Sequence, residues 1–98
     1  MSKAKVTFNG KVIAESDSTV IVEGNHYFPP DSVRAEFFAE NDKHTTCPWK
    51  GLASYYDVRV DETNAGSAAW TYHDPSRAAA RIKDYVAFYR HKVDAIEA

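Results

Sequence analysis

Alternating apolar and polar residues open the chain and predict strands. In residues 3–8, alanine, valine and phenylalanine alternate with lysine and threonine, which is typical of a strand with one buried face. Asn9 and Gly10 follow, and this pair favours a tight hairpin turn because both residues tolerate a positive φ. Residues 11–15 continue as a second strand, and residues 19–23, rich in β-branched side chains, predict a third. We therefore expect an antiparallel three-stranded meander over the first 23 residues.

The middle of the chain mixes strand patterns with one aperiodic segment. Residues 33–38 are ambiguous between strand and helix, and we favour strand. Residues 40–51 show no period and predict a loop of the length that tends to be functional or mobile. Strand patterns return over residues 53–60 and 68–72, which we expect to extend the sheet.

The last quarter of the chain carries the signals of a helix. Asp74 and Pro75 fit the N-cap and the first helical position. Apolar residues then recur at helical spacing and predict one long C-terminal helix that covers a face of the sheet. They are Ala78, Ile82, Tyr85, Val86, Tyr89, Val93 and Ile96. We therefore predict an α+β fold, mostly antiparallel β with one long C-terminal α-helix, as a single domain over residues 1–98.

Composition and charge restrict the classes of partner. Lys and Arg total 12 and Asp and Glu total 14, a formal net charge of -2, with no basic run. We therefore expect no nucleic-acid partner and no membrane partner, because both need a basic surface or a long apolar stretch. Cys47 is the only cysteine, and its solitary thiol favours a reducing, cytoplasmic location. The four histidines show no ligand spacing, so we expect no metal and no other cofactor.

The central segment holds two candidate catalytic residues, Cys47 and Lys50. The thiol would be a nucleophile if Lys50 or His44 lowered its pKa, but we favour the alternative that Cys47 is a small apolar residue of the interior. Lys50 would hold an anion with help from the hydroxyls of Thr45 and Thr46, or would be an ordinary solvated lysine.

Aromatic residues near this segment are candidates for the wall of a ligand pocket. Aromatic rings bury much area and offer flat faces for stacking, although packing in the core is the competing interpretation. Tyr55 is placed by alternation on the polar face of its strand, where a wet pocket or exposed surface is expected. The predicted ligand-binding residues are Thr46, Trp49, Lys50, Tyr55, Trp70 and Tyr72.

Short motifs in this chain resemble a known family. The most specific is Thr46-Cys47-Pro48-Trp49-Lys50-Gly51 followed by Ala53-Ser54-Tyr55-Tyr56, and later ones are Ala68-Ala69-Trp70-Thr71-Tyr72, Asp74-Pro75 and Tyr85-Val86-Ala87-Phe88-Tyr89. Over nearly the whole chain the sequence resembles domain-of-unknown-function family 427. The resemblance implies a compact, mostly β bacterial domain with a C-terminal helix, built as a tent-like β fold.

Two activities connected with such folds do not transfer to these residues. Tent-like relatives that bind zinc or reduce methionine sulfoxide use paired cysteines, which this chain lacks. The family is sometimes labelled nucleotidyltransferase-like, a reaction that needs clustered carboxylates around magnesium. The nearest pair on one strand face, Asp57 and Asp61, would lie roughly 13 Å apart, too far to bind one ion.

The sequence supports three hypotheses of function. The first is a domain, monomeric or homodimeric, that binds a small polar or anionic planar ligand in an aromatic-lined pocket. The second is a small enzyme of transferase or hydrolase type that uses Cys47 or Lys50. The third is a protein-interaction module that uses exposed aromatic residues.

Overall fold

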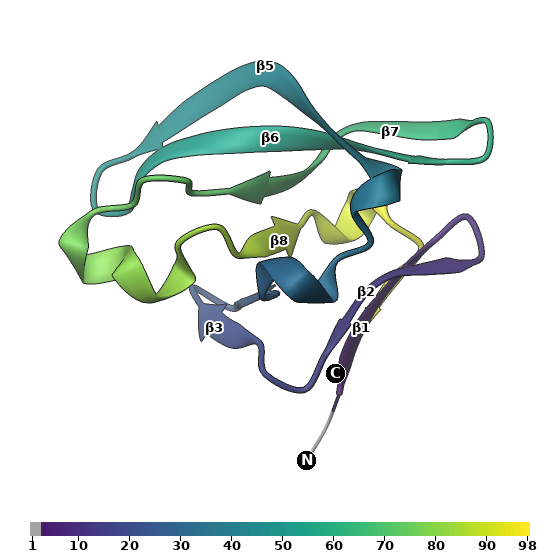
Figure 1. The fold of residues 1–98 in the computed structure, drawn as a ribbon, viewed down its shortest axis with the longest axis horizontal. Coiled ribbons are helices and arrows are strands. Elements are labelled where there is room, and N and C mark those ends of the chain that lie inside the picture. The colour runs from purple at the N-terminus through teal and green to yellow at the C-terminus, as the bar shows by residue number, and fades with distance from the viewer. Residues whose placement is uncertain (1–2) are drawn as a thin grey trace.

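The computed structural model describes residues 3–98 as an antiparallel β structure of three sheets with four short 3-10 helices (Figure 1). The first sheet has the order β2 (Lys11–Ser16), β1 (Ala4–Phe8), β9 (Ala95–Glu97). The second pairs β3 (Val20–Val22) with β4 (Asn25–Tyr27). The third has the order β5 (Phe38–Cys47), β6 (Gly51–Val60), β7 (Thr63–Thr71), β8 (Val86–Phe88). The helices are η1 (Pro30–Ser32), η2 (Ala35–Phe37), η3 (Arg77–Ile82) and η4 (Arg90–Lys92).

The opening hairpin is confirmed, but the three-stranded meander is wrong. β1 and β2 pair antiparallel across Asn9 and Gly10, which both have positive φ. β3 pairs with β4 instead of β2. The reason is the turn at Glu23 and Gly24, which have φ of 55° and 81° and so form a second tight hairpin of their own.

The loop predicted over residues 40–51 is wrong, because most of that segment is the edge strand β5. Its ladder with β6 runs from Phe38 opposite Val58 to Cys47 opposite Gly51, and only three residues form the turn between the strands. A register shift between Glu40 and His44 interrupts the ladder. The side chains of β5 are mostly exposed, so backbone pairing holds the strand without any apolar alternation. The strand favoured for residues 33–38 is wrong over Ala35–Phe37, which forms η2.

The long C-terminal α-helix is also wrong, which makes the fold mostly antiparallel β. The segment folds as η3, then β8, then η4 and β9. Asp84 has φ of 64°, a left-handed conformation that ends any helix there. Val86, Ala87 and Phe88 are all buried, and an amphipathic helix with one apolar stripe cannot bury three consecutive residues, whereas a strand covered on both faces can.

Two apolar clusters lie on the two faces of the four-stranded sheet. The first includes Phe28, Val58 and Phe88, and the second includes Tyr27 and Trp70. Paired backbone hydrogen bonds between Phe28 and Val86, of 2.8 and 2.9 Å, join the end of β4 to β8. The adjacent residues Tyr27 and Phe28 therefore anchor opposite clusters. Within residues 3–98 no helix is long and apolar enough to cross a membrane.

Candidate functional site

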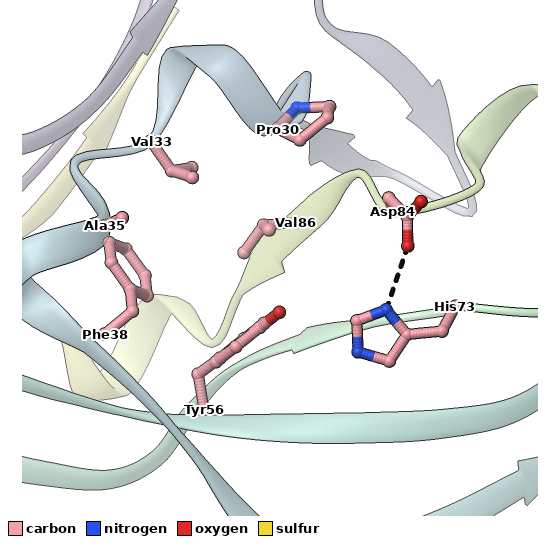
Figure 2. Close-up of a pocket in the computed structure, with 8 residues that line it drawn as sticks. All are labelled: Pro30, Val33, Ala35, Phe38, Tyr56, His73, Asp84 and Val86. Atoms are coloured by element: carbon pink, nitrogen blue, oxygen red, sulfur yellow. Dashed lines mark hydrogen bonds and ion pairs between the residues drawn. The ribbon is translucent and has the colours of Figure 1, made fainter.

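A pocket of about 410 Å³ opens on the face of the sheet that carries the first apolar cluster (Figure 2). Segments far apart in the chain form its walls. The stretch from η1 to the start of β5 gives one wall, β6 and the segment that follows β7 give the opposite wall, and the approach to β8 closes the back. The lining residues are Pro30, Val33, Ala35, Phe38, Tyr56, His73, Asp84 and Val86.

One end of the pocket is apolar and aromatic. The rings of Phe38 and Tyr56 meet edge to face, with centroids 6.0 Å apart and an interplanar angle of 87°. Phe38 also packs edge-on against Phe88, at 5.8 Å, which ties it to the first cluster. Val33 and Val86 complete this end in Figure 2. These contacts hold the rings in place, so the apolar end is a preformed surface.

The opposite end of the pocket is polar and is organised by His73. Its Nδ1 lies 2.9 Å from Asp84 Oδ1, and its Nε2 lies 3.0 Å from Glu40 Oε1. The hydrogen bond with Asp84 is the largest influence on the pKa of His73 and raises it. Burial lowers this pKa and the hydrogen bond with Glu40 raises it, so the net pKa is above its ordinary value. Both ring nitrogens can donate only when the imidazole is protonated, so this position between two carboxylates favours the imidazolium.

Tyr56 links the two ends, since its ring lines the apolar end and its hydroxyl points toward the middle of the pocket (Figure 2). Burial raises the pKa of this phenol, and the negative charges of Glu40 and Asp84 raise it further. The hydroxyl therefore stays protonated at neutral pH and senses a negative electrostatic potential.

The family comparison matches the whole chain. The model of the family described as domain of unknown function (DUF427) covers residues 1–98. This chain belongs to the DUF427 family. The resemblance seen in the sequence is thereby confirmed. A comparison with curated proteins finds no match.

The predicted ligand-binding residues of this DUF427 chain lie away from the pocket of Figure 2. Lys50 is 5% exposed and is ion-paired with Glu23, from the β3–β4 turn. Its Nζ lies 5.1 Å from the ring centroid of Trp49 and 5.6 Å from that of Tyr72. The structure thus brings Trp49, Lys50 and Tyr72 together, whereas Thr46 is exposed, opposite Leu52 on β6.

Tyr55 and Trp70 belong to the second apolar cluster and meet through a third ring. Tyr55 stacks parallel to Tyr89 with centroids 6.4 Å apart, and Trp70 lies 4.6 Å from the same ring. The Trp70 indole donates a hydrogen bond to the Tyr27 hydroxyl. Tyr55 and Trp70 are both buried, with at most 8% of either residue exposed. The polar face expected around Tyr55 is therefore aromatic core.

The groups around Lys50 and Cys47 shift the pKa values of both side chains. Burial lowers the pKa of Lys50, but the hydrogen bond with Glu23 outweighs it, so the net pKa is raised and the amine stays protonated. Cys47 is free and partly exposed. Burial raises the pKa of its thiol, but the backbone N–H groups of Trp49 and Lys50 and the Lys50 charge lower it by more in total. The thiolate is the form that these donors favour.

Sequence reasoning did not select the residues that line the pocket. His73 stood among four scattered histidines, and Asp84 fell inside the predicted helix. The alternation over residues 53–60 placed Tyr55 on the polar face, so Tyr55 was selected and its neighbour Tyr56, on the other face, was not. The adjacent His73, Asp74 and Pro75 offered the one local signal, a polar group directly after a strand.

Among residues 3–98, no group of three or more His, Cys, Asp or Glu side chains could hold a metal ion.

Proposed function

We propose that this DUF427 chain is a small-molecule-binding domain whose site is the pocket between Phe38 and His73. The observation that carries the proposal is the pairing of a fixed aromatic end with a fixed polar end in one cavity of about 410 Å³. Pockets for small ligands have volumes of roughly 300 to 1,000 Å³ and combine apolar walls with a few oriented polar groups. The polar groups here are oriented by each other, through the bonds of His73 to Asp84 and Glu40.

The second apolar cluster is a less suitable site for the same ligand. Its rings already use their flat faces and polar atoms on one another, as in the Trp70–Tyr27 hydrogen bond and the Tyr55–Tyr89 stack. A ligand would have to separate packed aromatic side chains, at the cost of the contacts that stabilise the core. The open pocket requires no such rearrangement.

An enzyme that uses Cys47 is the second candidate. The hydrogen bonds from Trp49 and Lys50 to the thiol favour it, since a thiolate is the nucleophilic form. Lys50 is the weaker candidate, because an ammonium paired with Glu23 has no lone pair to attack with. A free thiol also fits the cytoplasm, which we propose as the location.

Benzyl alcohol is a suitable probe for the pocket because it joins one aromatic ring to one polar group. Titration into the ¹⁵N-labelled protein is expected to shift the amide signals of Phe38, Tyr56, His73 and Val86 together, with a millimolar Kd. Such a Kd corresponds to about 4 kcal/mol, which a partly buried ring and one hydrogen bond supply.

A pocket-blocking variant provides the control. Ala35 is exposed and lines the pocket, so Ala35→Trp places an indole at the cavity without disturbing the core. Ala78→Trp, at an exposed position on η3, is the matched control. The Ala35→Trp variant is expected to lose the shifts and the control to keep them. Shifts that survive in Ala35→Trp, or that cluster around Trp70, would refute this site.

A further inference from the structure

We infer that the pocket selects a ligand with an apolar, preferably aromatic, body and a protonated amine. This inference rests on the proposed function and adds the chemical class of the ligand. It follows from three features of the polar end: which hydrogen-bonding groups are left to a ligand, what net charge they carry, and where they lie relative to the aromatic end.

The hydrogen-bonding groups left to a ligand are mainly acceptors. His73 already directs both ring nitrogens to Asp84 Oδ1 and Glu40 Oε1. Within residues 3–98, the structure records no hydrogen bond to Asp84 Oδ2 or to the hydroxyl of Tyr56, and both residues line the pocket. Glu40 holds His73 but is not a lining residue, so it contributes charge rather than a direct contact. An ionised carboxylate only accepts hydrogen bonds, so a ligand that donates several is the complementary partner.

The net charge of the polar end is negative. Two carboxylates flank one imidazolium, which leaves one negative charge when His73 is protonated and two when it is not. The basic residues next to the lining residues in sequence are Arg34 and Lys83. Both are exposed, and among the described residues neither forms an ion pair with Glu40 or Asp84. A cation is therefore attracted and a carboxylate or phosphate repelled.

The two ends lie on opposite sides of the same cavity, as Figure 2 shows for Phe38 and Tyr56 on one side and His73 and Asp84 on the other. A ligand that spans the pocket must then be apolar at one end and positive at the other. The Tyr56 hydroxyl lies between, where it accepts from an ammonium or donates to a neutral group. Of the polar or anionic planar ligands expected from the sequence, the anionic ones would meet the wrong sign of charge here.

Three probes that differ only in their polar group test this inference: benzylammonium, benzyl alcohol and benzoate, each titrated at pH 6.5 and 0.15 M salt. The order of affinity is expected to be benzylammonium, then benzyl alcohol, then benzoate. Each step is expected to be about threefold to tenfold, the range between an exposed ion pair and a charge-assisted hydrogen bond.

The Asp84→Asn variant isolates the charge when wild type and variant are compared at pH 5.5, because removal of Asp84 lowers the pKa of His73 and the imidazole must carry the same charge in both proteins. Asparagine tolerates the positive φ at this position and can still accept from His73 Nδ1, so the pocket keeps its shape. This variant is expected to weaken benzylammonium about threefold to tenfold and to leave benzyl alcohol unchanged. Glu62→Gln, at the exposed β6–β7 turn, is the matched charge control and should change neither.

The outcomes separate the two proposals. If benzyl alcohol shifts the pocket signals and benzylammonium binds no more tightly than benzyl alcohol or benzoate, the ligand class is wrong and the binding site stands. If none of the three probes shifts those signals, both the site and the ligand class are overturned. Equal loss of benzylammonium binding in Asp84→Asn and Glu62→Gln would also refute the specific role of Asp84.

Discussion

The indole N–H of Trp70 donates a 3.1 Å hydrogen bond to the hydroxyl of Tyr27, and the two rings meet edge to face with centroids 6.2 Å apart. Tyr27 is fully buried and Trp70 is 8% exposed, so the indole has little access to water as a substitute partner. Tyr27→Phe keeps the ring contact and removes only the acceptor. We expect the free energy of unfolding in urea to fall by about 1–3 kcal/mol.

Tyr85→Phe is the matched control for this change. Tyr85 packs at the edge of the same cluster, and its hydroxyl has no hydrogen bond recorded within residues 3–98. We expect this control to change the free energy of unfolding by less than about 0.5 kcal/mol. Equal losses in the two variants would show that the Trp70–Tyr27 bond adds nothing specific.

The ion pair between Lys50 and Glu23 predicts that removal of one partner destabilises the fold more than removal of the other. Glu23→Gln leaves the buried Lys50 ammonium without its counter-charge, and we expect it to destabilise the fold. Lys50→Met keeps the length of the side chain against Trp49 and Tyr72, and leaves the exposed Glu23 to water.

A double-mutant cycle measures the coupling between these two residues. The Glu23→Gln and Lys50→Met double variant is expected to be more stable than Glu23→Gln alone, because no buried charge remains. The measurement is the urea midpoint of the four proteins. Strict additivity of the two single effects would contradict the ion pair.

The lowered pKa of Cys47 predicts a shifted profile of thiol reactivity. The rate of labelling is expected to reach half of its plateau at a lower pH than that of a free model thiol measured under the same conditions. Lys50→Met removes the positive charge but keeps the backbone donors, so its profile should move up in pH without reaching that of a free thiol. A wild-type profile at or above the free-thiol value would remove the basis for a catalytic role of Cys47.

The raised pKa of His73 predicts that the protein loses stability as the pH rises. Since the pKa is higher in the folded state than the ordinary value of 6.5, the contribution is complete below about pH 6.5 and is lost as the pH passes the folded pKa. The side chains of His73 and Asp84 are nearly half exposed, so we expect only a few tenths of a kcal/mol.

His73→Gln tests this pH dependence directly. Comparison of urea unfolding at pH 6 and pH 8.5 should show a smaller decrease for the variant than for the wild type. The folded pKa itself is read from the ring proton signals of His73 over the same range. A signal that titrates at or below pH 6.5 would contradict the double hydrogen bond to Asp84 and Glu40.

The parts of the fold that sequence predicted are those set by local rules. Asn9 and Gly10 specify a turn whatever surrounds them. The strand predicted over residues 53–60 is confirmed within β6, where Val58 and Val60 face the first cluster. The family motif at Cys47 to Gly51 was equally local and identified the family correctly.

The predictions that were wrong concern segments whose structure depends on contacts between residues distant in sequence. β5 is held by its backbone ladder to β6, so its side chains carry no pattern to detect. The apolar spacing of residues 78–96 matches a helix, yet Val86 and Phe88 pack into the first cluster and Ala87 into the second. The pocket likewise joins Phe38, His73 and Asp84 only after β5, β6, β7 and β8 have formed their sheet.

The pairing of β9 with β1 bears on how the chain folds during its synthesis. Lys5 lies opposite Glu97, and the backbone N–H of Asp94 donates to the Thr7 carbonyl, so the first sheet cannot be completed before residues 94–97 have been synthesised. Until then β1 has β2 on one side and an unsatisfied edge on the other. Before β9 emerges, a nascent chain exposes this edge of β1, where the strand of another chain can pair with it.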